Sequence, residues 1–486
     1  MTNLSYPAGW SAMSQVRRDA AAWSASSAWN VNFNNGNVNN NHRNNNGFAL
    51  AVRRAGEFQG GVTLQGLHRA WKRARRQKVP SHNQRRFDTR WMDNLIQLQE
   101  EIASGTWSPR PSTCFIATRP KAREIHAPDF ADRVVHHWLV PQLEAIYEPG
   151  FIHDSYANRA GKGSHAAVRR AQAFCRQLAS GQGGGWYLQL DIANYFNSIH
   201  RPTLWAMLKP RLLRAGLHPH ALQTTHALLR RDPLHPGAQT RATAAELAQV
   251  PAHKRLCNAG PGCGLPIGNL SSQFFANVYL DALDQLAKHQ LKAKRYLRYV
   301  DDFVLFHRDR AQLEAWQAQI TDFLGRQLHL GLKAEIRLRR LDDGLDFLGY
   351  VIRPTHTLVR PRVVAHAKAA LQKIEAALPR DGQPHFAPEA LQRVQAVLAS
   401  YGGHFRHANA RRLTQHLTRR FPWAAMSSVH ASPPAGGVTS CASESVSAPS
   451  PSAARSASRR CWWPTSWRGC TAIACRPSTN CKGLTR

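Results

Sequence analysis

An aspartate pair set between two apolar, β-rich runs limits the possible folds of this chain more than any other segment. Arg295–Tyr299 precedes the pair and Phe303–Phe306 follows it, which predicts two strands joined by a turn at Val300, Asp301 and Asp302. A bare aspartate pair is usually a solvated turn. Here the apolar flanks predict burial, and two buried neighbouring carboxylates repel each other and need a cation.

A third carboxylate follows another strand candidate. Trp186–Leu190 predicts a short strand after the glycine-rich break Gly181–Gly185, and Asp191 stands at its end. An aspartate at a strand end and a pair on a neighbouring hairpin can converge on two divalent ions. Hard oxygen ligands suit Mg²⁺, with Mn²⁺ as an alternative. Two such ions would activate an attacking 3′-hydroxyl and stabilise a leaving pyrophosphate.

The charge of the chain indicates a polyanionic partner. Its 486 residues include 64 Lys and Arg against 30 Asp and Glu, a formal charge of +34, and few folded proteins carry such an excess without nucleic acid. No apolar run reaches about 18 residues, and Met1–Trp10 has no secretory pattern, so no membrane association is expected. Nine cysteines, five of them after position 440, form no disulfide framework. We expect a cytoplasmic protein.

Three stretches of the chain differ in texture. Residues 1–58 contain an asparagine tract, Trp29–Asn46, which should not form a stable helix. Residues 62–420 have the periodic apolar spacing of a globular chain. From Ser427 onward Ser, Ala, Pro, Arg, Cys and Trp dominate, which predicts a largely disordered tail.

Helical signals flank the strand candidates. Leu64–Ser104 predicts two basic helices. Ser272–Gln290 predicts a buried amphipathic helix with Ser272 near its start. The pattern is helical again over Val364–Leu417.

Five motifs occur in the order of motifs A to E of reverse transcriptases. They are DIANYF (191–196), GLPIGNLSSQ (264–273), YVDDF (299–303), the glycine-leucine-lysine run ending at Lys333, and FLGY (347–350). Upstream, residues 121–137 and 154–167 look like the fingers segments of bacterial reverse transcriptases. The chain therefore resembles this family over roughly residues 62–420.

The resemblance implies an α+β right-hand polymerase with fingers, an antiparallel palm sheet, a helical thumb and disordered termini. The expected divisions are 1–58, an asparagine-rich arm; 59–185, fingers with the start of the palm; 186–355, palm; 356–426, thumb; and 427–486, a low-complexity tail.

The resemblance also implies residue roles. Asp191, Asp301 and Asp302 match the catalytic metal-binding carboxylates. Phe196 matches the aromatic gate against a ribose 2′-hydroxyl, although alone it would read as core packing. Lys121 and Arg123 match the cations that hold the incoming triphosphate, although most such residues are surface charges.

Two further motifs have roles in the family. Lys333 matches a proton donor to pyrophosphate, although it could equally be a solvated loop lysine. Phe347, Leu348, Gly349 and Tyr350 resemble the primer grip, and could equally be a buried strand end.

The second motif separates subfamilies. Ile267 stands where retroviral enzymes have a glutamine that contacts the incoming nucleotide, Gly268 follows it, and Gln273 replaces a proline. This pattern is similar to reverse transcriptases of diversity-generating retroelements. Loss of a polar contact beside the nascent pair predicts weak discrimination, unless Ile267 merely packs the palm.

The asparagine tract supports the same subfamily. Asparagine codons are adenine-rich, and these retroelements mutate a template repeat at adenines. The tract resembles the variable end of their target proteins, so we interpret residues near 27–54 as translated template repeat; a functional polar arm is the alternative. The implied partners are template RNA, primer or cDNA, deoxynucleotides and a small basic accessory protein.

Other readings stay open. A retron, group II intron-type or defence-associated reverse transcriptase is the near alternative, and a catalytically silent nucleic-acid-binding protein is the distant one. Cys257 and Cys263, separated by five residues, could bind zinc, but no second pair at zinc-site spacing accompanies them.

Overall fold

The computed structural model describes residues 27–31, 38–42, 61–76, 79–118, 121–180, 184–234, 237–377 and 388–426. Their contacts divide the chain into two compact units, Met1–Arg360 and Pro361–Arg486. The boundaries predicted between fingers, palm and thumb stay predictions. The tail 427–486 and most of the arm 1–58 lie outside the described residues.

The asparagine tract contributes an antiparallel strand pair, β1 (Ser27–Val31) and β2 (Val38–His42), with Val31 opposite Val38. The described residues of the tract are therefore strand rather than helix. Strands were not predicted, because asparagine is depleted in strands.

Three helices, not two, occupy the basic segment that follows. The additional break comes after Pro80, where the Ser81 side chain accepts a hydrogen bond from the Gln84 N–H at 3.3 Å and starts a new helix. The helices are α3 (Leu64–Arg75), α4 (His82–Thr89) and α5 (Trp91–Ala103), and α6 (Phe130–Tyr147) packs against all three.

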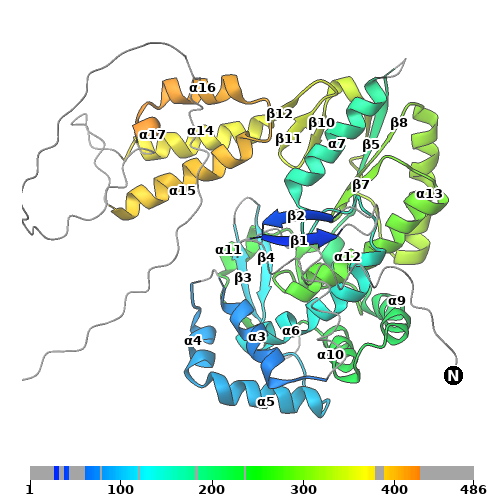
Figure 1. The fold of residues 1–486 in the computed structure, drawn as a ribbon, viewed down its shortest axis with the longest axis vertical. Coiled ribbons are helices and arrows are strands. Elements are labelled where there is room, and N and C mark those ends of the chain that lie inside the picture. The colour runs from blue at the N-terminus through cyan, green and yellow to red at the C-terminus, as the bar shows by residue number, and fades with distance from the viewer. Residues whose placement is uncertain are drawn as a thin grey trace, which may run out of the picture. The chain divides into compact units, whose positions relative to one another are not determined.

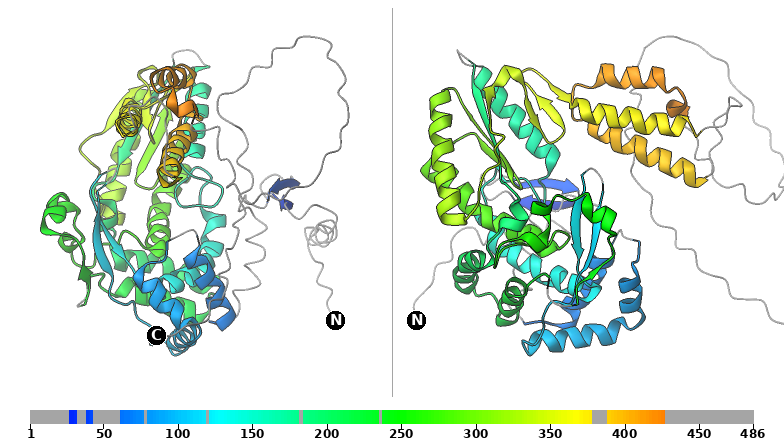
Figure 2. Two further views of the ribbon diagram at one scale, coloured as in Figure 1. Left: turned by 90° about the vertical axis from the view of Figure 1, so that its left-hand side faces the viewer. Right: turned by 180° about the vertical axis from the view of Figure 1, so that it is seen from behind.

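A small sheet stands beside these helices (Figure 2). β3 (Thr113–Ala117) pairs antiparallel with β4 (Arg123–Ala127) and parallel with the short β6 (Gln239–Thr240). Burial alternates along β3 and β4, so one face of the hairpin points inward.

The central sheet is antiparallel, with strand order β7-β8-β5-β9, and helices α7 and α13 pack on it (Figure 1). The strands predicted at Trp186–Leu190, Arg295–Tyr299 and Phe303–Phe306 are confirmed. Their interiors are almost wholly buried, which explains why they read as continuous apolar runs. The bounds are β5 (Trp186–Asp191), β7 (Tyr296–Tyr299), β8 (Asp302–His307), β9 (Arg337–Arg340), α7 (Ser164–Ala179) and α13 (Arg310–Leu328).

The buried helix predicted from Ser272 begins two residues earlier, as α12 (Leu270–Gln285), and continues as a π-helical turn, Leu286–Gln290. It packs against α6, α9 and α13. The remaining helices of this region are α8 (Tyr195–Ser198), α9 (Arg201–Arg214), α10 (Pro219–Arg230) and α11 (Ala244–Ala248).

A three-stranded antiparallel sheet ends the first unit, and helices make up the described part of the second. The strands are β10 (Leu345–Phe347), β11 (Tyr350–Ile352) and β12 (Thr357–Val359). The helices are α14 (Pro361–Glu375), α15 (Pro388–Phe405), α16 (Arg411–Arg420) and α17 (Trp423–Met426). The predicted α+β class is therefore confirmed. Within the described residues, no helix is both long and apolar enough to cross a bilayer.

Candidate active site

The Asp301–Asp302 pair lies where β7 turns into β8. Tyr299 pairs with Asp302, which leaves Val300 and Asp301 as a two-residue turn. Val300 has a φ of +57°, at a turn position that glycine usually occupies. A β-branched residue in the left-handed region costs roughly 1–3 kcal/mol, so the surroundings must hold this turn in place.

Arg298 supplies that support from inside the fold. Its Nη1 donates to the Val300 carbonyl at 2.9 Å, and its Nε and Nη2 donate to the Asp284 carboxylate at 2.8 and 2.6 Å. Asp284 lies on α12 and also accepts from the Tyr296 hydroxyl at 2.7 Å. Both charged side chains are almost fully buried. The pair therefore fixes the turn to α12.

β5 brings the third carboxylate to the turn. Asp191 is the direct cross-strand partner of Asp302, and the Ile192 N–H donates to the Asp301 carbonyl at 3.3 Å. The structure thus brings together the three aspartates that the sequence predicted to converge. Each is partly exposed at this edge of the sheet.

The two carboxylates of the turn, Asp301 and Asp302, resist ionisation. Burial raises the pKa of Asp302 to about 7, against hydrogen bonds from Gln189, and the charge of Asp191 adds to the shift. Burial and the same neighbour raise the pKa of Asp301 to about 6. At neutral pH the cluster therefore has a strong electrostatic demand for a cation.

Lys333 supplies part of the positive charge that the carboxylates need. Its Nζ lies 2.5 Å from Asp191 Oδ2, and its backbone N–H donates to the Asp191 carbonyl at 2.8 Å. Asp191 Oδ1 is buried and has no hydrogen-bond partner among the described residues. The structure thus places Lys333 at the carboxylates themselves, although its side chain is 44% exposed.

The donor set fits divalent magnesium. Three converging carboxylates supply hard ligands and excess negative charge: Asp301 and Asp302 have raised pKa values, and Asp191 has an unpartnered buried oxygen. Asp191, Asp301 and Asp302 are the residues that could hold such ions.

Gln189 links this cluster to the next sheet. Its Nε2 donates to both oxygens of Asp302, at 3.0 and 3.3 Å, and to the Asp346 carbonyl on β10 at 3.2 Å. Sequence reasoning missed Gln189 and Arg298. The signal was available, because each is a polar residue inside an apolar strand, where it needs a buried partner.

The segment before α12 touches the β3–β4 hairpin. The His126 N–H donates to the Ile267 carbonyl at 2.7 Å. Gly268 has a φ of +126°, and a Cβ there would lie 2.9 Å from the His126 carbonyl oxygen, so a side chain would clash. Ile267 is partly buried, while Gln273 is exposed on α12.

The predicted triphosphate cations lie on the same hairpin. Arg123 begins β4 and Lys121 precedes it, and both are exposed. Phe196 lies on α8, packs partly buried against the core and accepts through its carbonyl from the Leu265 N–H at 2.8 Å. The Phe196 position therefore combines a core contact with partial exposure.

The predicted primer-grip residues form the β10–β11 turn. Phe347 pairs with Tyr350, and both are buried. Between them Leu348 and Gly349 have φ values of +51° and +88°. Two positive φ angles define a tight type I′ hairpin, which presents Leu348 at its tip.

Comparison with known proteins agrees with this geometry. Residues 116–352, which include all three aspartates, match the family described as reverse transcriptase (RNA-dependent DNA polymerase). The chain carries a reverse transcriptase domain. Its enzyme class is therefore RNA-directed DNA polymerase.

Named relatives of this reverse transcriptase domain are distant. The chain is 23% identical over 344 residues to protein YkfC of Escherichia coli (strain K12), covering 64% of this chain and 81% of YkfC. It is 25% identical over 205 residues to group II intron-encoded protein LtrA of Lactococcus lactis subsp. cremoris, covering 42% of this chain and only 29% of LtrA.

Solved structures similar to the chain include two telomerases. One, from Candida albicans in complex with a fragment of telomeric RNA, has a TM-score of 0.38 at 10% identity and covers 69% of this chain and 62% of its own. The other, from Candida tropicalis, has a TM-score of 0.35 at 10% identity and covers 55% and 60%.

Proposed function

We propose that the chain copies RNA into cDNA by nucleotidyl transfer at Asp191, Asp301 and Asp302. The observation that carries this proposal is the convergence of three carboxylates at the end of β5 and the β7–β8 turn, where the pKa values of Asp301 and Asp302 are raised. Two Mg²⁺ ions, when bound there, would supply activation of the 3′-hydroxyl and charge stabilisation of the leaving pyrophosphate.

The surrounding residues have distinct roles in this proposal. Lys333 donates a proton to the leaving pyrophosphate from its position beside Asp191. Lys121 and Arg123 bind the incoming triphosphate, since they are exposed on the hairpin that contacts the Ile267–Gly268 segment. Phe196 excludes a ribose 2′-hydroxyl, and Phe347–Tyr350 contacts the primer.

We assign the enzyme to a diversity-generating retroelement, in which it copies a template-repeat RNA with errors at adenines for mutagenic retrohoming. Two sequence features support the assignment: the segment Ile267–Gln273 and the asparagine tract. The Ile267 carbonyl is held by the His126 N–H while its side chain is only partly buried. An apolar group at a nucleotide contact discriminates poorly.

The proposed partners follow from charge and family. Template RNA and primer would neutralise the +34 excess. A small basic accessory protein would bind the polymerase, and the complex would act in the cytoplasm.

The decisive test restores a polar side chain. Ile267→Gln adds an amide that can hydrogen-bond the nucleotide or template backbone. One such contact is worth about 1–3 kcal/mol, so adenine errors should fall roughly tenfold to two-hundredfold. The measurement is sequencing of cDNA made from an adenine-rich template, with Ile267→Leu as the matched apolar control. An active Gln variant with unchanged adenine errors would show that Ile267 only packs the palm.

A second candidate is a group II intron-type reverse transcriptase, which the match to LtrA favours. The wild-type cDNA separates the two. Errors concentrated at adenines support the retroelement, whereas errors spread evenly over the four bases support the intron-type enzyme.

A further inference from the structure

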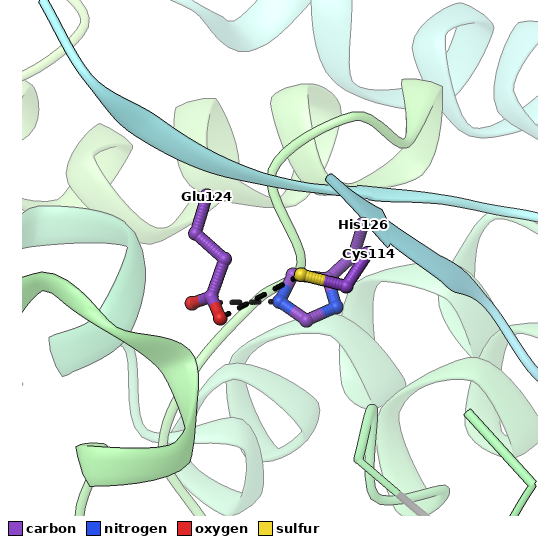
Figure 3. Close-up of side chains that lie close together, drawn as sticks. All are labelled: Cys114, Glu124 and His126. Atoms are coloured by element: carbon purple, nitrogen blue, oxygen red, sulfur yellow. Dashed lines mark hydrogen bonds and ion pairs between the residues drawn. The ribbon is translucent and has the colours of Figure 1, made fainter. Parts of the chain in front are cut away.

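A cysteine, a glutamate and a histidine gather on the inward face of the β3–β4 hairpin (Figure 3). Cys114 is the cross-strand partner of His126, and Glu124 precedes His126 by two residues on the same face. One ligand atom from each side chain lies within 4.8 Å of the others. The hairpin register therefore assembles three metal-binding side-chain types in one place.

The cluster is buried and incompletely satisfied. The exposed fractions of Cys114, Glu124 and His126 are 7%, 9% and 2%. Neither ring nitrogen of His126 has a hydrogen-bond partner among the described residues. The Leu256 N–H donates a hydrogen bond to the Glu124 carboxylate, and the His126 ring lies against the same group. Buried imidazole nitrogens that make no hydrogen bond are costly unless a metal ion completes them.

Two separations within the cluster, each to a different oxygen of Glu124, are close to those between ligands of a tetrahedral ion. Bonds of about 2.0–2.3 Å to zinc separate neighbouring ligands by roughly 3.3–3.8 Å. Cys114 Sγ lies 3.8 Å from Glu124 Oε1, and His126 Nε2 lies 3.5 Å from Glu124 Oε2. A thiolate and an imidazole select zinc over magnesium, which prefers oxygen alone.

We infer that Cys114, Glu124 and His126 bind one zinc ion, with water in the fourth position. Nothing in the cysteine spacing indicated this site, because its ligands come from paired strands rather than from one short motif. Cys257 and Cys263, which lack a second pair at zinc-site spacing, are not part of it.

The position of the site gives the ion a structural role. The Leu256 N–H donates to Glu124 Oε2 at 2.6 Å, and the His126 N–H donates to the Ile267 carbonyl. Zinc here would fix the hairpin that carries Lys121 and Arg123 against the chain leading into Ile267. This site shares no ligand with the site proposed at the aspartates. A negative result for one site therefore does not decide the other.

Metal analysis of the full chain tests the inference. Protein purified without chelators should contain about one zinc per chain, and Cys114→Ser and His126→Ala should lose it. Cys175→Ser is the matched control, because Cys175 is also buried but belongs to no such cluster in the described residues. Asp301→Asn should keep its zinc. Zinc absent from wild type, or retained equally by Cys114→Ser, would overturn the inference.

Cobalt spectroscopy on the wild-type chain covers the case in which variants fail to fold. Co²⁺ bound here should show a thiolate-to-metal charge-transfer band and the intense visible bands of tetrahedral coordination. Both should persist in Cys175→Ser and disappear when excess zinc is added. Absence of the charge-transfer band would exclude Cys114 as a ligand and refute the site.

Discussion

The chain contains two aspartate pairs that differ in almost everything except their sequence. Asp301–Asp302 sits at a two-residue turn between largely buried strands, faces Asp191 and has raised pKa values. Asp342–Asp343 follows β9 in a short 3₁₀ turn and is exposed. The dipeptide itself is therefore uninformative. The flanking residues determine whether the two charges are solvated or are partly buried together and need a metal ion.

The largest expected effect comes from neutralising one member of the Asp301–Asp302 pair, compared with the same change in the exposed pair. Asp301→Asn should reduce Mg²⁺-dependent cDNA synthesis roughly a thousandfold or more, equivalent to about 4 kcal/mol, because the ligand charge is lost. The melting temperature should hold or rise, since the amide avoids burying a charge. Asp342→Asn is the matched control and should leave primer extension unchanged. Equal rates in the two variants would erase the functional difference between the pairs.

The next effect concerns what holds the buried pair. Arg298→Met leaves Asp284 as a buried charge without its cation, which should lower the free energy of unfolding by about 3–5 kcal/mol. The exposed pair Arg326–Asp322 on α13 supplies the control, and Arg326→Met should cost less than about 1 kcal/mol. Chemical denaturation measures both. Similar losses would show that burial adds nothing to the Arg298 pair.

A pH effect should follow from the raised pKa values. A carboxyl whose folded pKa is raised contributes stability below its ordinary value near 3.8, and that contribution is lost as pH rises through about 6 for Asp301 and 7 for Asp302. The melting temperature of the metal-free protein should therefore fall between pH 4 and 7, relative to the melting temperatures of Asp301→Asn and Asp302→Asn. Added Mg²⁺ should raise the melting temperature more at pH 8 than at pH 5.5. Melting temperatures that change with pH in the same way in wild type and in both variants would contradict the raised pKa values.

The smallest effect concerns the turn itself. Val300→Gly removes left-handed strain but also loses apolar contact and adds unfolded-state entropy. The terms oppose each other, so stability should change by no more than about 1 kcal/mol. Leu348→Gly, at a second hairpin tip among the described residues that has a non-glycine residue with positive φ, should behave alike. Chemical denaturation measures the free energy of unfolding of both variants. A loss above about 2 kcal/mol in Val300→Gly alone would mean that the Val300 side chain, rather than its backbone, holds the turn.

Sequence patterns predicted the parts of the structure that local rules control. The strands around Asp301, the convergence with Asp191 and the helical C-terminal unit follow from apolar periodicity and turn chemistry. The start of α12 was misplaced by two residues, because Asn269 begins the helix without a side-chain cap.

The rest depended on contacts between distant segments. Arg298 and Gln189 act through partners on α12 and β10, and the Cys114 cluster depends on strand register. No local pattern specifies such pairings. A polar residue within an apolar strand signals only that some partner exists.

The hydrogen bond from His126 to Ile267 has an evolutionary consequence. Both of its atoms belong to the backbone, so under the nucleotide contact proposed for Ile267 a mutation at position 267 would change the side chain offered to the substrate without removing this bond. The proposed control of accuracy and the local backbone geometry would then be encoded separately at this residue. On that proposal, copying fidelity could evolve in either direction through one codon while the fold is kept.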